Sequence, residues 1–199
     1  MVAVANVHDV AAFMLAQRGP MTTMKLHKLL YYAQAWSLAS RGRVLFGETI
    51  KAWEQGPVVS EVFAESKGMR TVATWPRGNA ARLHDDDAQH VRDVLTRYGH
   101  LSGDELSALT HAEAPWRNAR ATGEQSPEIE RPAMEAWFRF PLDGDGFDLE
   151  AEPQPSGVDI EDEIAYLEGR GPDPWPNSSS IAAIGRPHVL SLPEGHPPP

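Results

Sequence analysis

The chain has 199 residues, a formal net charge of −10 and no cysteine. The absence of cysteine excludes disulfides, thiolate metal ligands and a cysteine nucleophile, and redox chemistry is not expected. No stretch of about eighteen apolar residues is present, so the sequence predicts no membrane span, and the N-terminal apolar run lacks the basic head of a secretion signal. We therefore expect a cytoplasmic protein with one domain and a tail.

The negative charge is concentrated in the C-terminal part of the chain. Residues 1–142 carry 16 basic and 16 acidic side chains, which leaves 2 basic and 12 acidic side chains for residues 143–199. Because this second segment is also rich in proline and glycine, we expect a largely disordered acidic tail, in which residues 158–168 could form a short partner-binding helix. An acidic arm repels nucleic acid, so no direct nucleic-acid binding is expected.

The patterns within residues 1–142 predict a mainly α, compact single domain with at most a short two-stranded β element. The first two helices are predicted at residues 7–17 and 24–40. The residues predicted to begin and end them are Asn6 or Asp9, Thr22 or Thr23, Gly19 and Gly42.

The helix at 24–40 has two different flanks. Its apolar face consists of Leu26, Leu29, Leu30, Ala33, Trp36 and Leu38. Its other flank mixes aromatic and basic groups, namely Lys25, Lys28, Tyr31, Tyr32 and Gln34. We expect this helix to be half buried, with the second flank shown to solvent or to a partner. The alternative is that the aromatic residues Tyr31, Tyr32 and Trp36, together with Trp53, complete the core.

The stretch from 48 to 77 carries weaker signals. Residues 48–53 alternate between apolar and polar side chains and permit a short strand, which could pair with residues 70–77 as a small ribbon. Gly56 and Pro57 form a structural turn, and the valines after them predict a helix from about Pro57 to Ser66. In that interpretation the proline occupies the first helical position, where no hydrogen bond is lost.

Three further helices are predicted downstream. The first begins at Asp85-Asp86-Asp87, and the next begins at Ser102, which has the spacing of a capping box with Glu105. The last follows Ser126-Pro127-Glu128 and is interrupted early by Pro132.

Two groups of side chains raise the question of catalysis. The three adjacent aspartates could bind a hard cation, but acids at a helix start are explained by the helix dipole, and neighbouring helical residues do not converge on one ion. His111 and Glu113 resemble an acid/base pair, yet residues two apart on a helix face different ways. We therefore expect no catalytic, metal or cofactor site, and a structural role for His111 and Trp116.

Several motifs occur in an order that resembles a known family, the Panacea antitoxin domain of SocA-like, phage-associated proteins. The resemblance covers roughly residues 5 to 140. The motifs are Lys25-Leu26, Lys28 to Gln34, Leu45-Phe46, Ile50 to Trp53, Gly56-Pro57-Val58, Tyr98-Gly99, Leu106-Ser107, Leu109-Thr110-His111 and Pro115-Trp116-Arg117.

This resemblance implies a helical antitoxin that is not an enzyme and that neutralises a toxin encoded beside it by direct protein binding. An alternative within the same family is a proteolytic adaptor that delivers the toxin to a protease or unfoldase. The partner-binding candidates are Lys25, Lys28, Tyr31, Tyr32, Gln34, Trp36, Trp53, Gln55, Trp116 and Arg117. Aromatic side chains suit such a role because they give large contact area at low entropic cost.

Two functions from other classes compete with the antitoxin interpretation. A metal-dependent hydrolase would be built around His111, Glu113 and the three aspartates, but the sequence lacks a spaced set of ligands. A transcription regulator would need a basic recognition helix, and the acids beside Arg92 and Arg97 oppose one.

Overall fold

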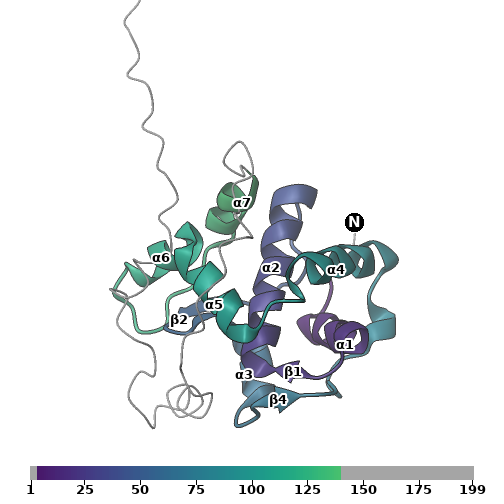
Figure 1. Ribbon diagram of the computed structural model, residues 1–199. Helices are drawn as coiled ribbons and strands as arrows, with labels where there is room; N and C mark the ends of the chain where they lie inside the picture. The colour runs from purple at the N-terminus through teal and green to yellow at the C-terminus, as the bar shows by residue number, and fades with distance from the viewer. Residues whose placement is uncertain (1–3, 140–199) are drawn as a thin grey trace, which may run out of the picture.

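The computed structural model describes residues 4–139, which form a mainly α-helical fold with two small sheets (Figure 1). The predicted fold class is therefore confirmed. The acidic tail at 143–199 and the short helix expected near 158–168 lie outside the described residues. In the part that is described, no helix is long and apolar enough to cross a membrane.

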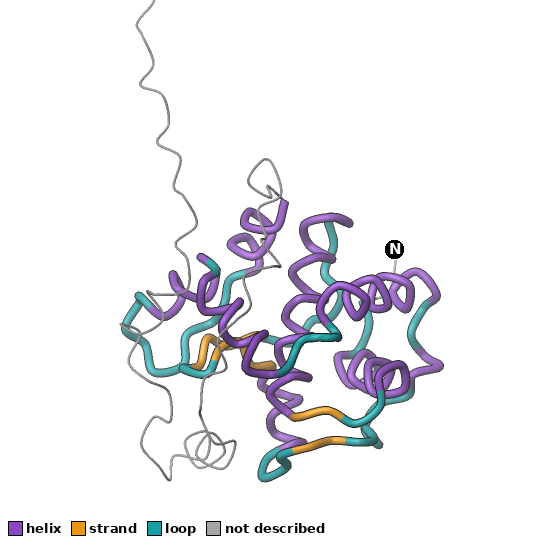
Figure 2. Tube along the Cα trace, viewed as in Figure 1, coloured by secondary structure: helices purple, strands orange, loops and turns teal. Residues whose placement is uncertain are grey.

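Figure 2 shows that helices make up most of the described trace, with the strands as short segments between them. The helices are α1 (Val7–Arg18), α2 (Thr23–Arg41), α3 (Ser60–Ser66), α4 (Asp85–Tyr98), α5 (Gly103–Ala112), α6 (Ala114–Arg120) and α7 (Arg131–Arg139), with a 3₁₀ turn, η1 (Ala80–Arg82). The strands are β1 (Met21–Thr22), β2 (Ile50–Trp53), β3 (Gly56–Val59) and β4 (Thr71–Val72).

Helix α2 is the element around which the others pack. It contacts α1 and α4 on one side and α5, α7 and β3 on the other (Figure 1). Because neighbours surround it, its buried residues do not form one stripe, and they include Lys28 and Gln34 as well as the leucines. The prediction of a half-buried helix is therefore wrong: α2 is buried almost all round.

The predicted helix ends agree with the observed ones where local side chains decide them. The side chain of Asn6 accepts a hydrogen bond from the backbone N–H of His8, and that of Thr22 accepts one from Lys25. Ser102 and Glu105 form the predicted capping box at the start of α5. Each interaction satisfies a backbone donor that the helix leaves unpaired.

The β2–β3 hairpin corrects two predictions. The strands pair antiparallel from Ile50 opposite Val59 to Trp53 opposite Gly56, joined by a two-residue turn, so Pro57 lies in a strand and the helix begins only at Ser60. The predicted pairing of 48–53 with 70–77 is also wrong, because β4 pairs with β1. Strands joined by a tight turn pair with each other at little entropic cost, which explains the local partner.

The segment before α7 also differs from the prediction. The backbone N–H of Ala52 donates to the carbonyl of Pro127, and that of Ile129 donates to the carbonyl of Ile50. Residues 127–129 thus line the free edge of β2 instead of capping a helix. Helix α7 begins at Arg131, so that Pro132 lies in its first turn, where proline is tolerated.

The three aspartates begin α4 as predicted, and two of them form ion pairs. Arg41 and Arg43 both contact Asp86 and Asp87 at 2.5 to 2.7 Å, and Asp87 is buried. Among the described residues, no three potential ligand side chains are grouped so that they could hold a metal ion. The aspartates therefore tie the start of α4 to the end of α2.

Candidate functional site

Two tyrosines of the α2 motif meet the junction between α5 and α6 in a polar network inside the core. At its centre, the carboxylate of Glu113 accepts hydrogen bonds from the hydroxyls of Tyr31 (2.7 Å) and Tyr32 (2.8 Å). Glu113 is only 1% exposed. Burial raises the pKa of Glu113 to about 7, although the two tyrosine hydrogen bonds act in the opposite direction.

Stacked rings extend this network to α4 and α7. The rings of Tyr32 and Tyr98 lie nearly parallel with centroids 4.0 Å apart, and Phe138 of α7 packs edge-on against Tyr31 and Tyr32. Aromatic pairs in these geometries are favourable beyond their buried area. The tyrosines of the motif thus hold three helices together.

The hairpin turn is fitted closely against α2 and α5. Gly56 has a φ of 102°, and a Cβ atom at this position would lie 2.7 Å from Cε of Lys28 and 3.0 Å from Oγ1 of Thr110. Ser107 donates a hydrogen bond to the backbone carbonyl of Gln55 at 2.9 Å. The glycine is therefore required both by the backbone angle and by the close approach, as the interpretation of a structural turn predicts.

Gln34 fixes the chain that enters the hairpin. Its amide nitrogen donates to the carbonyl of Phe46 at 3.0 Å, and its amide oxygen accepts from the backbone N–H groups of Leu45 (2.9 Å) and Phe46 (3.2 Å). The side chain is fully buried. Gln34 therefore supplies backbone partners that a loop in the core would otherwise lack.

Two buried histidines are neutral in this environment. Nδ1 of His27 accepts from the backbone N–H of Val59 at 3.2 Å, and the ring of His111 packs on that of Trp116 with centroids 4.1 Å apart. Burial, followed by the charge of Lys28, lowers the pKa of each histidine to about 3. The Trp116 contact agrees with the structural role predicted for His111.

The pKa shifts of Glu113 and of the two histidines make the stability of the fold depend on pH in opposite directions. The raised pKa of Glu113 gives a contribution that is complete below pH 4.5 and is lost as the pH rises towards about 7. The lowered pKa values of His27 and His111 give contributions that are complete above pH 6.5 and are lost as the pH falls towards about 3.

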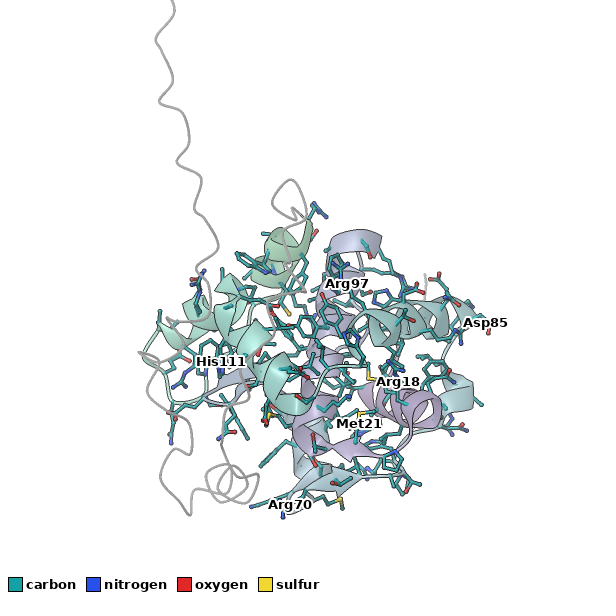
Figure 3. All side chains as sticks on the ribbon, viewed as in Figure 1. Arg18, Met21, Arg70, Asp85, Arg97 and His111 are labelled. Atoms are coloured by element: carbon teal, nitrogen blue, oxygen red, sulfur yellow. The ribbon has the colours of Figure 1, made fainter. Side chains whose placement is uncertain are left out.

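The groups of the hydrolase hypothesis are not brought together. Figure 3 shows His111 and Asp85 on opposite sides of the molecule. Both carboxylate oxygens of Glu113 are engaged by tyrosine hydroxyls. The described residues therefore do not assemble the acid/base and metal site that this hypothesis requires.

The partner-binding candidates fall into two groups in the structure. Lys28, Tyr31, Tyr32 and Gln34 are buried in the core, contrary to the expectation that this flank of α2 is shown to solvent, and Gln55 of the hairpin turn is also buried. Lys25, Trp36, Trp53, Trp116 and Arg117 keep some exposure. Only the second group can be reached by a partner without rearrangement of the domain, and contact with a partner stays a prediction for all ten.

Three half-exposed aromatic residues form one surface feature, which we call the hairpin face: Trp53, Phe63 and Trp116. The indole N–H of Trp116 donates to the carbonyl of Trp53 at 2.9 Å, and Phe63 packs edge-on against Trp53 with centroids 4.7 Å apart. Sequence reasoning missed Phe63. Phe63 lies four residues after Val59, the last residue of the hairpin, so its proximity to Trp53 could have been inferred only if the hairpin had been predicted.

The other partly exposed candidates of α2, Trp36 and Lys25, contact the end of α4. The guanidinium of Arg97 lies 4.7 Å from the ring centroid of Trp36, and Lys25 donates to the carbonyl of Gly99 at 3.0 Å. Both interactions join α2 to the end of α4. Trp36 and Lys25 are therefore separate from the hairpin face, and the exposed candidates do not form one continuous surface.

The described residues form a helical domain in which motif residues from distant parts of the sequence contact one another through buried polar side chains. No catalytic group is assembled among these residues. Residues 26–117 match the model of the family described as Antitoxin SocA-like, Panacea domain. Residues 26–117 are therefore similar to the SocA-like Panacea domain, and the resemblance predicted from the motifs is confirmed.

One relative and the solved structures complete the comparison. The chain is 28% identical over 116 residues to Antitoxin SocA of Caulobacter vibrioides (strain NA1000 / CB15N), and the match covers 49% of this chain. It spans 58% of the length of that relative. No solved structure gives a significant match. Helix α7 and the loop before it lie beyond the residues that match the family model.

Proposed function

We propose that this protein is an antitoxin that neutralises a toxin encoded beside it by direct protein binding in the cytoplasm. The observation that carries the proposal is the match of residues 26–117 to the Antitoxin SocA-like, Panacea domain family. The similarity to a protein named Antitoxin SocA agrees with it.

The distribution of side chains supports binding as the mode of action. The titratable groups with the largest pKa shifts are buried and serve the core, whereas Trp53 and Trp116 offer aromatic surface. Aromatic side chains at the centre of a contact supply much of the binding energy in protein interfaces. We therefore propose that the antitoxin acts without catalysis and without a cofactor, with the hairpin face as the first surface to test.

The test is co-expression with the neighbouring reading frame. We expect the neighbouring product alone to stop growth, and expect this protein to restore growth and to co-purify with it. A harmless neighbour, or a toxicity that this protein leaves unchanged, would contradict the proposal. The amount of toxin on an immunoblot separates neutralisation by binding, which preserves the toxin, from delivery to a protease, which depletes it.

Variants of the hairpin face refine the same experiment. Trp53→Ala together with Trp116→Ala should weaken rescue, because both rings lose contact area. Because Trp116 also packs on His111, a thermal melt must accompany the growth assay. As a control for lost stability, Trp75→Ala removes a buried indole that packs near His8 and leaves both tryptophans of the hairpin face in place.

A further inference from the structure

A groove opens beside α6, the loop after it and the first turn of α7. Its volume is about 260 Å³. Four of the residues that line it are apolar: Pro115, Ala119, Pro127 and Ala133. The first three are buried and Ala133 is partly exposed, so the apolar side chains form the bottom of the groove.

The rim of the groove carries negative charge. Glu124, Glu128 and Glu130 line it and are exposed, and its lining contains no basic side chain. Lys51 approaches Glu128 at 3.8 Å and offsets part of this charge. No ion pair within the described residues offsets Glu124 or Glu130 in the same way. The groove therefore combines an apolar floor with a net acidic rim.

We propose that this groove is an interaction surface for a basic, lysine- or arginine-bearing segment of a partner protein. A long basic side chain fits both parts, because its aliphatic stem can lie on the proline and alanine floor while its charged head reaches the glutamates. The volume is below the roughly 300–1,000 Å³ of pockets that enclose small ligands, which suits one or two side chains of a protein.

The charge of the rim disfavours binding of the chain's own acidic C-terminal segment in the groove. The chain's own residues 143–199 carry 12 acidic and 2 basic side chains and would be repelled by an acidic rim. The groove also lies almost wholly outside the part that matches the family, since only Pro115 of its apolar floor falls within residues 26–117. The match to the family therefore does not describe most of this groove.

Under the proposed function, on which this step rests, the basic segment belongs to the toxin. Association and dissociation rates of the full chain with the neighbouring product are measured at about 0.05 M and 0.5 M salt, where the screening length differs several-fold. Glu124→Lys should slow association roughly tenfold at low salt and about twofold or less at high salt, because steering by charge is screened.

Matched controls separate the groove from net charge and from helix stability. Asp93→Lys makes the same charge change on α4, on the other side of α2 (Figure 1), and should leave the rates close to those of the parent. Ala133→Phe fills the groove and should speed dissociation at both salt concentrations, whereas Ala136→Phe adds the same ring to an exposed position of α7. Rates that are equal for Glu124→Lys and Asp93→Lys would overturn the inference while the proposed function stands.

A second probe tests the groove if the neighbouring product does not bind. A labelled peptide of alternating lysines and alanines, about fifteen residues long so that it can form a marginal helix, is titrated into the full chain and followed by fluorescence anisotropy. Glu124→Lys should weaken its binding at least about fivefold relative to Asp93→Lys. Equal affinities would show that net charge alone holds the peptide, and the groove inference would then be wrong.

Discussion

Replacement of Gly56 by alanine tests the geometry on which the hairpin and the polar core depend. The backbone at Gly56 has a φ of 102°, which costs an L-residue about 1–2 kcal/mol. The added Cβ would also lie 2.7 Å from Cε of Lys28, which must move within a core where it is 1% exposed. Such overpacking costs about 1–3 kcal/mol, so we expect a total destabilisation of about 2–5 kcal/mol.

The assay is thermal and urea unfolding of Gly56→Ala beside a control that isolates the backbone angle. Gly19 also has a positive φ, 78°, but a Cβ there meets no atom within 4 Å, so Gly19→Ala should cost only the backbone strain. A domain of this size shifts its Tm by roughly 3–5 °C per kcal/mol, and Gly56→Ala should melt about 10 °C below the parent.

Equal Tm values for the two variants would refute the reasoning that the hairpin turn is packed against Lys28. A Gly56→Val variant should be destabilised at least as much as Gly56→Ala, because valine adds two more methyl groups. If either Gly56 variant melts like the parent but no longer binds a toxin, the turn contacts the partner instead.

Two further predictions concern protonation and the tail. Between pH 4.5 and 6.5, unfolding lets His27 and His111 each bind a proton and lets Glu113 release one. The free energy of unfolding should therefore rise by about 1.4 kcal/mol per pH unit from these three groups. Glu113→Gln should roughly double that slope, because the proton released by Glu113 no longer offsets one of those bound by the histidines. Urea unfolding of the parent and of Glu113→Gln at pH 5 and pH 6 measures both slopes. A slope that Glu113→Gln leaves unchanged would show that Glu113 is ionised in the folded protein. A chain ending at Leu142 should melt like the full chain, and loss of residues 143–199 should slow toxin association at low salt if the tail steers the encounter; identical rates at two salt concentrations would mean that the tail takes no part.

The sequence alone determined the features that depend on a few neighbouring residues. The start of α5 follows from the pair Ser102 and Glu105, and those of α1 and α2 were narrowed to Asn6 or Asp9 and to Thr22 or Thr23, because a capping side chain reaches a backbone group two or three residues away. The left-handed residue after α2 follows from Gly42, because glycine has no Cβ and adopts this conformation without steric cost. The resemblance to the antitoxin family also followed from the sequence, since the motifs that carry it are linear.

The tertiary structure decided which side chains are buried and what Pro57 does. The hydrogen-bond partner of Tyr31 is Glu113, which lies 82 residues further along the chain. The pattern of residues within α2 does not predict that such distant segments cover it. Pro57 favours a helix start locally, but pairing with Ala52 places it in a strand. The groove likewise exists only where α6 and α7 pack, because burial and surface shape depend on contacts distant in sequence, whereas helix caps depend on adjacent residues.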